Sequence, residues 1–290
     1  MTTIREKGYA HWDGEFIDRR FPWWPITRTS IKLAFQRKHF KFFFSGAFIP
    51  AVVFLVGIYI SERIEDFRFM FKGSDKLLVI NPAYFKTYMT GDFLLFMIVM
   101  LLTFSGAGLI SDDIKHNSLQ LYFSRPIRKM DYFLGKASVI FFFTLVLTLV
   151  PGLIFFFMKL VFSGNFDFFL AYPWLPLAVF AYAGLLTVFL AFYTLLISAL
   201  SKNRRYVSIM MFTIYIFSES IHGILFGIFR NPYLALFSIK ANIQQAGAAI
   251  FGQKLPYAFP QYLSFLVLGA VCLLSAYVLK RRIRGVEVIR

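Results

Sequence analysis

The chain has 290 residues, of which 58% are hydrophobic and 16% are charged, and its mean hydropathy is +0.65. A soluble domain usually carries about a quarter charged residues, so this composition excludes a soluble protein and indicates a polytopic membrane protein. The formal net charge of +16 would suggest nucleic acid as a partner of a soluble protein, but here the basic residues lie beside apolar runs, where anionic lipid head groups attract them. We therefore expect membrane lipids, and no nucleic acid, among the partners.

Residues 1–41 form a basic and aromatic leader. Trp23 and Trp24 suit a membrane interface, and from Thr29 the apolar residues alternate with Lys and Arg as in an amphipathic helix. We expect this helix to lie on the membrane surface, with Pro22 and Pro25 marking its upstream limit. A disordered basic tail is the alternative.

Six apolar runs are long enough to cross the hydrocarbon core as helices. They are Phe42–Ile60, Phe93–Ile110, Ala137–Met158, Trp174–Leu200, Tyr206–Phe229 and Tyr262–Leu279. The predicted fold is therefore all-α: a leader (1–41), one six-span domain (42–280) and a basic tail (281–290). Kinks are expected where prolines fall inside or near the start of a run, namely at Pro50, Pro151 and Pro176.

The distribution of Lys and Arg orients the spans. Most of them lie in the leader, between the second and third runs, after the fourth run and in the tail. The positive-inside rule therefore places both termini in the cytoplasm, and we expect a multi-pass protein of the plasma membrane, which is the inner membrane in a prokaryote. On the other side, residues 230–261 are long and apolar, and predict a helix that either lies on the outer surface or dips into the membrane.

The cytoplasmic loop after the second run reads SDDIKHNSLQLYFSRPIRKMDYFLGKAS from Ser111. Its apolar residues predict a short helix that carries Ile114, Leu119, Leu121, Tyr122 and Phe123. The residue before a proline is pushed toward extended conformations, so the Arg125-Pro126 step predicts a turn. A second helix should begin near Lys129 or Met130, which gives a helical hairpin.

The fifth run contains ionisable residues, which are costly inside a membrane. Glu219, His222, Gly223 and Gly227 share one helix face. The glycine pair would let another helix approach closely, as at a dimer seam, whereas Glu219 could make a structural hydrogen bond, pair with His222 or contribute to a pathway. A Glu-x-x-His motif also occurs in di-iron bundles, but those need further carboxylates from neighbouring helices, so we expect no metal. Cys272 is the only cysteine and can form no disulfide within the chain.

The loop resembles the cytoplasmic loop between the second and third spans of ABC-2 type transporter permeases. The family pattern is matched by Asp113, Asn117-Ser118, Leu119, Leu121, Ser124, Pro126, Arg128 and Gly135-Lys136. Members commonly have Glu in place of Asp113 and Gly-Thr in place of Asn117-Ser118. Six spans, an amphipathic leader and a long apolar segment before the last span also fit the family plan.

The resemblance implies a permease, most plausibly an exporter, in which two permease subunits form the pathway and two separate ATP-binding cassette subunits hydrolyse ATP. The second permease would be another copy or a relative. This chain has no GxxxxGK[ST] motif, so we expect it to be no enzyme, with no catalytic residue and no bound cofactor, and ATP and Mg to reside in the partner.

The same resemblance makes the hairpin the place where the ATPase docks. Asp113 and Arg128 would then contact the ATPase or clamp the hairpin, and Leu119, Leu121, Tyr122 and Phe123 would supply its apolar footing. The plainer interpretation is that these charges only solvate a loop. The alternative function is a membrane-embedded assembly or signalling subunit that recruits a cytoplasmic partner without transport.

Overall fold

The computed structural model describes residues 21–63, 79–123 and 127–282, which form helices and contain no strand. The helices are α1 (Trp24–Phe35), α2 (Lys38–Gly46), α3 (Ile49–Glu62), α4 (Pro82–Met89), α5 (Asp92–Gly106), α6 (Gly108–Lys115), α7 (Ser118–Phe123), α8 (Lys129–Leu147), α9 (Leu149–Ser163), α10 (Asp167–Ala171), α11 (Leu175–Leu200), α12 (Arg204–Phe229), the 3-10 helix η2 (Pro232–Phe237), α13 (Ile239–Ile250) and α14 (Gln261–Arg282). The all-α prediction is confirmed.

Six helical segments are long and apolar enough to cross a membrane, which confirms the predicted number of spans. They are Lys38–Glu62, Pro82–Lys115, Lys129–Ser163, Leu175–Leu200, Arg204–Phe229 and Gln261–Arg282. The first three are each built from more than one helix, whereas the last three are single helices. The protein is therefore a multi-pass membrane protein.

Each of the three prolines singled out in the sequence stands in the first turn of a helix. Pro50 is the second residue of α3, Pro151 is the third residue of α9 and Pro176 is the second residue of α11. A first-turn proline sacrifices no hydrogen bond, because the amide it lacks would have no partner within the helix. The apolar runs that contain Pro50 and Pro151 are therefore divided into two helices just before the proline.

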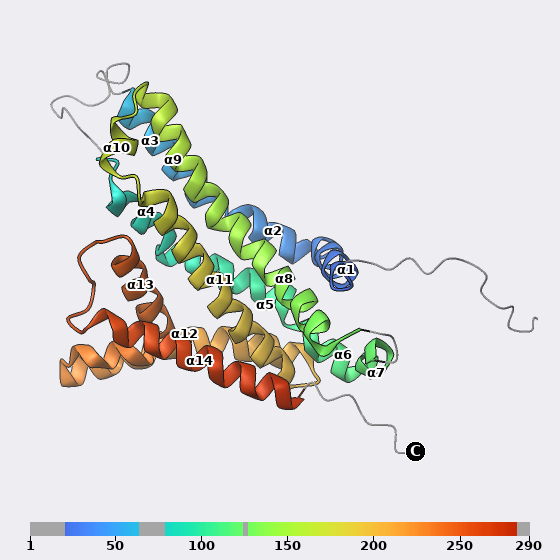
Figure 1. Cartoon of the computed structure of the whole chain (residues 1–290). Coiled ribbons are helices and arrows are strands. Elements are labelled where there is room, and N and C mark those ends of the chain that lie inside the picture. The colour runs from blue at the N-terminus through green and yellow to red at the C-terminus, as the bar shows by residue number, and fades with distance from the viewer. Residues whose placement is uncertain (1–20, 64–78, 124–126, 283–290) are drawn as a thin grey trace, which may run out of the picture.

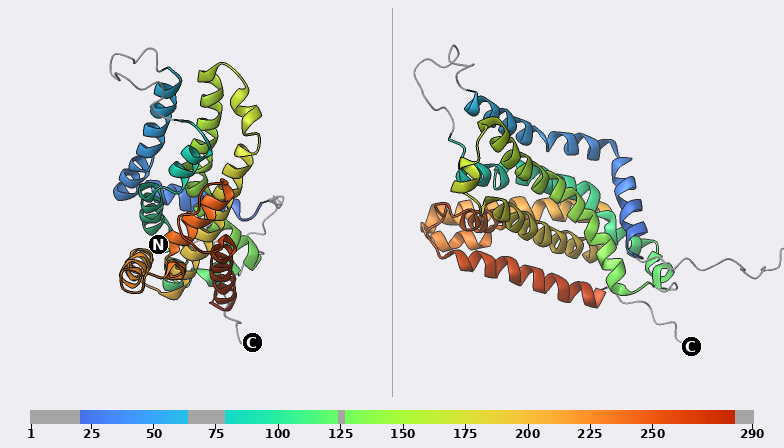
Figure 2. Two further views of the ribbon diagram at one scale, coloured as in Figure 1. Left: turned by 90° about the vertical axis from the view of Figure 1, so that its left-hand side faces the viewer. Right: turned by 45° about the horizontal axis from the view of Figure 1, so that its top comes forward.

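The spans form a bundle around α11, which contacts α5, α6, α8, α9, α12, α13 and α14. Figure 1 shows α6, α7 and the start of α8 at one end of the bundle, together with α1, and α13 and α10 toward the other. We call these the α7 end and the α13 end. The last described residues of α14 lie at the α7 end, as both views in Figure 2 show.

The second span is the core of the bundle and the first and fifth are its margin. In its most apolar stretch the second span is 67% buried, against 11% for the first and 17% for the fifth. The exposed faces of the first and fifth spans are thus free to contact lipid or another protein chain.

The leader helix α1 packs along the start of α8. The Thr27 hydroxyl donates a hydrogen bond to the Gly135 carbonyl at 2.9 Å, and a Cβ on Gly135 would lie 2.9 Å from Ile26 Cβ and 3.0 Å from the Trp23 carbonyl oxygen. Only glycine allows this approach. The helix begins at Trp24, between Pro22 and Pro25, which the sequence predicted as its upstream limit, and Pro25 stands in its first turn.

Part of the aromatic excess joins α1, α2 and α8. The Phe143 ring centroid lies 5.8, 4.8 and 6.1 Å from those of Phe35, Phe40 and Phe44. Edge-to-face pairs of this kind contribute about 0.5–1.5 kcal/mol each beyond the area they bury. The leader helix α1 and the start of α2 are therefore part of the folded bundle.

The segment before the last span folds as η2 and α13, and α13 packs against α14, α12 and α11. Most of its middle is buried on all sides: Ala241, Asn242, Ile243, Gln245, Ala246, Gly247 and Ala248. The predicted helix is present and packs among the spans, and its small residues allow this close packing. A Cβ on Gly247 would meet Thr90 Cγ2 at 2.4 Å.

Candidate functional site

Between Ser111 and Pro126 the sequence predicted one short helix, whereas the structure divides this stretch between two helices. The second span continues as α6 to Lys115, and a separate helix, α7, carries residues 118–123. The break lies at Asn117, whose φ of 54° is left-handed. Asparagine is one of the few non-glycine residues that adopt this conformation readily, which explains how it replaces glycine here. We call α6, α7 and α8 up to Lys136 the 108–136 segment.

Asp113 ties the two sides of this segment together. Its Oδ2 lies 2.7 Å from Lys136 Nζ and accepts a hydrogen bond of 2.7 Å from the Tyr132 hydroxyl. The side chains of Lys136 and Asp113 are only 6% and 14% exposed. Of the two roles considered for Asp113, its position fits clamping of the segment, since its charge is already satisfied inside the protein.

Tyr122 extends this clamp to α7. Its ring centroid lies 5.3 Å from that of Tyr132, and Lys136 Nζ lies 5.8 Å from the Tyr122 centroid and 5.5 Å from the Tyr132 centroid. Burial, together with the charge of Asp113, raises the pKa of Tyr122. The phenol thus stays neutral beside the carboxylate, and α6, α7 and α8 are held by one group of contacts.

The remaining predicted residues of the segment fall into three groups. Leu119 packs against the core as expected of an apolar footing. Arg128 is exposed just before α8, where its backbone N–H donates to Asp131 Oδ2 at 3.2 Å. Leu121 and Phe123 belong to α7, but their side chains lie outside the described part of the structure, as does Pro126 with its predicted turn.

Two arginines anchor the same end of the second span. Arg37 Nη1 and Arg204 Nη2 each donate a hydrogen bond of 2.6 Å to the Phe104 carbonyl oxygen. Burial lowers the pKa of Arg37, and the nearby charge of Asp112 opposes this effect. The junction before α2 and the start of α12 therefore meet at one carbonyl of α5.

A serine of α11 completes the junction between α5 and α6. The Ser198 hydroxyl donates to the Ala107 carbonyl at 2.9 Å and accepts from the Ile110 and Ser111 amides at 2.9 and 3.2 Å. A side chain that enters the hydrogen-bond ladder in this way is an ordinary cause of a helix kink. The kink lies within the second span, directly before the 108–136 segment.

A second candidate site surrounds Glu219 toward the α13 end. Glu219 Oε2 accepts a hydrogen bond of 2.5 Å from the Ser238 hydroxyl, and Glu219 Oε1 lies 3.0 Å from Lys240 Nζ. Lys240 Nζ also lies 3.4 Å from Asp92 Oδ1, which accepts a hydrogen bond of 2.7 Å from Gln244 Nε2. We call Asp92, Glu219, Ser238, Lys240 and Gln244 the polar cluster.

Lys240 balances part of the negative charge of the polar cluster. Burial disfavours its ammonium form, but the hydrogen bonds and charges of Glu219 and Asp92 outweigh burial and raise the pKa of Lys240. Lys240 is therefore fully charged at neutral pH. Of the contacts considered for Glu219 in the sequence, the interhelical one is observed, and the partners come from α13 and its N-cap.

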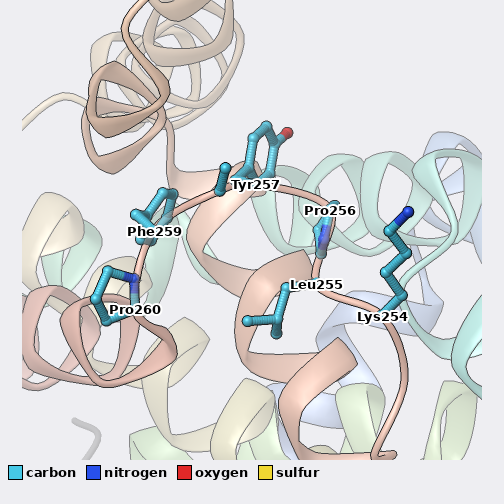
Figure 3. Close-up of a pocket in the computed structure, with 7 residues that line it drawn as sticks. Lys254, Leu255, Pro256, Tyr257, Phe259 and Pro260 are labelled. Atoms are coloured by element: carbon cyan, nitrogen blue, oxygen red, sulfur yellow. The ribbon is translucent and has the colours of Figure 1, made fainter.

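His222 does not pair with Glu219 and instead contacts two aromatic rings. Its ring centroid lies 5.6 Å from that of Tyr257 and 6.0 Å from that of Phe226, and its Nδ1 is buried without a hydrogen-bond partner in the described residues. Tyr257 belongs to residues 254–260, which line an open groove (Figure 3). Gln245 fixes this loop through hydrogen bonds to the Tyr257 and Phe259 carbonyls of 3.1 and 3.0 Å.

Gly223 and Gly227 lie on an exposed face of α12. A Cβ built on either residue would meet nothing within 4 Å. Packing within the chain thus gives no reason for glycine at these positions, and the dimer seam stays a prediction. Within the described ranges, no group of three or more His, Cys, Asp or Glu side chains could hold a metal ion.

Sequence analysis missed Asp92, Lys240 and Gln244. Asp92 was left just outside the second apolar run, although the structure places it in a helix that continues the span. A signal was present, because Lys240 and Gln244 stand one turn apart in an otherwise apolar segment. Their partners lie about 150 residues earlier in the chain, where no local pattern indicates them.

A model of a protein family described as ABC-2 family transporter protein matches residues 4–281, which is nearly the whole chain. No curated protein sequence matches the chain.

Proposed function

Because the chain belongs to the ABC-2 family of transporter proteins, we propose that it is the permease subunit of an ATP-binding cassette exporter. It works as a dimer, with a second copy or a relative, and separate ATPase subunits dock on residues 111–136 of the 108–136 segment. The permease itself binds neither ATP nor Mg, which the partner ATPase holds. Both termini and the α7 end lie in the cytoplasm, in a prokaryote beneath the inner membrane.

The observation that carries this proposal is the Asp113–Lys136 ion pair. Its Nζ and Oδ2 atoms, 2.7 Å apart, join the last turn of the second span to the start of the third. A partner that moved α7 would therefore move both spans with it. ATP held in such a partner supplies what a two-state membrane bundle needs, namely a ligand that binds the two states unequally.

The side chains exposed on the 108–136 segment suit a docking surface. His116, Asn117, Gln120, Arg128, Lys129 and Met130 are all exposed. Met130, an apolar residue that is 65% exposed, stands between Lys129 and Asp131 where it can enter a pocket of a partner. The basic charge of this end also supports its cytoplasmic location.

Charge reversal at the surface tests the docking. The chain is co-expressed with a candidate ATPase from the same genome and purified in dodecyl maltoside. We expect Arg128→Glu combined with Met130→Asp to abolish co-purification and ATPase stimulation. The matched control is Arg205→Glu, which reverses an exposed charge at the same end but outside the segment. If the double variant retains a normally stimulated ATPase, the docking assignment is wrong.

A membrane-embedded assembly or signalling subunit is the second candidate. Its supporting observation is that His116, Asn117 and Gln120, at and just before α7, are polar and exposed, which recruitment alone would also require. Inside-out proteoliposomes decide between the two, since an exporter accumulates its cargo in them when ATP is added outside. A complex that hydrolyses ATP but moves none of a broad panel of compounds, peptides and lipids would favour the assembly subunit.

A further inference from the structure

The polar cluster lies within the depth of the membrane. Glu219 is 15 residues after Arg204 and 10 before Phe229, so at 1.5 Å per residue it stands about 22 Å and about 15 Å from the two ends of α12. Lys240 contacts both Glu219 and Asp92, which puts all three charges at one depth. A hydrocarbon core about 30 Å thick would surround them.

Asp92 cannot face that hydrocarbon. Its side chain is 69% exposed in the single chain, and a carboxylate at a lipid-facing position costs several kcal/mol or more. Charged side chains at such depth face a protein interior or a water-filled cavity. The exposed side of the cluster therefore borders water or a polar ligand.

The charge presented on that side is negative. The cluster contains two carboxylates and one ammonium group, and the Lys240 side chain is only 20% exposed while that of Asp92 is 69% exposed. The positive charge is thus placed inward and a carboxylate outward. A ligand that completes this arrangement carries a positive charge.

A buried hydroxyl without a hydrogen-bond partner among the described residues also lies beside the polar cluster on α12. Tyr215 stands one turn before Glu219 on the same face of α12. The residue is 4% exposed, and its hydroxyl has no hydrogen-bond partner among the described residues. Buried hydroxyls are normally bonded, so this one is available to a ligand or to its water.

Aromatic rings continue the site toward the middle of the membrane. Phe96 follows Asp92 by one turn of α5, and its ring centroid lies 6.1 Å from that of Phe212, two turns from Glu219 on α12. Both turns lead away from the α13 end. A carboxylate therefore stands beside an aromatic surface, which suits a cation attached to an apolar body.

We propose that the polar cluster and the Phe96–Phe212 pair form a binding site for an amphipathic cation, whose positive group meets Asp92 and whose apolar part lies along α5 and α12. This inference rests on the proposed transport function, because it names the class of substrate. The cation could be a small amphipathic molecule or the ammonium-bearing head group of a lipid, and the experiment below distinguishes the two.

The test uses two ions of nearly equal size and opposite charge. Purified protein in dodecyl maltoside is dialysed to equilibrium with radiolabelled tetraphenylphosphonium or with tetraphenylborate. We expect saturable binding of the phosphonium and none of the borate. Asp92→Asn should weaken phosphonium binding about tenfold, and Lys240→Gln should strengthen it because both carboxylates become free. Asp167→Asn, an exposed carboxylate in α10, serves as the matched control.

Equal binding by wild type and Asp92→Asn, or a preference for the borate, would overturn the site. A lowered affinity in Lys240→Gln would also count against it, since a merely structural cluster would lose binding with either change. Displacement of the phosphonium by added phosphatidylethanolamine would identify a lipid head group as the occupant. Without displacement, the occupant is a non-lipid amphipathic cation.

A labelling experiment tests access to position 92 from water without relying on the affinity of a variant. Asp92→Cys in a Cys272→Ala chain should react with a membrane-impermeant maleimide, and tetraphenylphosphonium should protect it. Failure to react in a correctly folded protein would contradict access from water. None of these measurements needs the ATPase, so a failure here leaves the docking proposal standing, and a failure of co-purification leaves the site standing.

Discussion

Asp113 and Lys136 form an ion pair that closes the loop between the second and third spans, with 2.7 Å between Oδ2 and Nζ and neither side chain more than 14% exposed. Pairs this well buried contribute little net stability when both members are present, yet they are costly to break. The pair is thus a device that fixes geometry. The residues are 23 positions apart and belong to different spans.

Removal of one partner from this pair should destabilise the protein strongly. Asp113→Asn leaves the Lys136 ammonium buried without its counter-charge, at a cost of about 3–5 kcal/mol. Melting of the purified protein, followed by intrinsic fluorescence in detergent, measures the effect. Lys129→Met, which removes an exposed charge one turn away from Tyr132, should leave the melting temperature unchanged.

The double variant makes this prediction specific. Asp113→Asn together with Lys136→Met removes both charges and should recover a large part of the stability lost in Asp113→Asn alone. If the two single effects simply add, the residues are not coupled and the clamp does not exist.

Gly135→Ala should separate the leader helix from α8. The new Cβ would stand 2.9 Å from Ile26 Cβ and 3.0 Å from the Trp23 carbonyl oxygen, which is backbone and cannot move aside alone. Overpacking of this kind costs about 1–3 kcal/mol, and the melting temperature should fall. At Gly184 a Cβ meets nothing within 4 Å. Gly184→Ala should therefore be neutral or slightly stabilising, because alanine favours the helix more than glycine does, and a similar fall in both variants would show that the close approach at Gly135 is not the cause.

Gly227→Leu should weaken self-association without harming the fold. A side chain at Gly227 meets nothing within its own chain, so the melting temperature of the monomer should stay unchanged. If α12 forms the dimer seam, the bulky side chain keeps the second helix away. Cross-linking of Gly223→Cys in a Cys272→Ala chain reports the contact directly. Gly269→Leu on the open face of α14 is the control, and equal dimer fractions in both leucine variants would exclude this seam.

The contribution of Lys240 to stability should be lost only at strongly alkaline pH. Its pKa is raised in the folded protein, so the stabilisation is fully present below the unfolded value of about 10.4 and disappears as the pH rises through the folded value. The difference in melting temperature between wild type and Lys240→Gln should thus be constant from neutral pH to about pH 9.5. A difference that already shrinks below about pH 9 would contradict the raised pKa.

Local patterns of sequence predicted the parts of the fold that depend on local physics. Runs of apolar residues gave six spans, and the start of α8 at Lys129 was expected from the loop pattern. The helix breaks at Ala107 and Asn117 were not expected. The first depends on Ser198 of a distant span, and the second depends on a backbone conformation that asparagine permits but does not impose.

The sequence predicted a candidate site well where its residues lie close together in the chain, and poorly where they lie far apart. Asp113, Tyr122 and Lys136 lie within 24 residues of one another in the sequence, and the structure brings them together as a clamp, whereas Gly135 packs against the leader helix. Glu219 was recognised because an acid inside a span is unusual, but its partners were not. Lys240 pairs with both Glu219 and Asp92 because α13 packs among the spans, and contacts between such distant parts of the chain leave no periodic signal in the sequence.

The Phe104 carbonyl oxygen, which accepts hydrogen bonds from Arg37 and Arg204, has a mechanical consequence. It joins the first, second and fifth spans at the α7 end, and the Asp113–Lys136 pair adds the third. At this end of the bundle, two hydrogen bonds and an ion pair therefore hold four spans together. At the α13 end the spans are connected through α13 and its polar cluster, so the two ends of the bundle are held together by different sets of contacts.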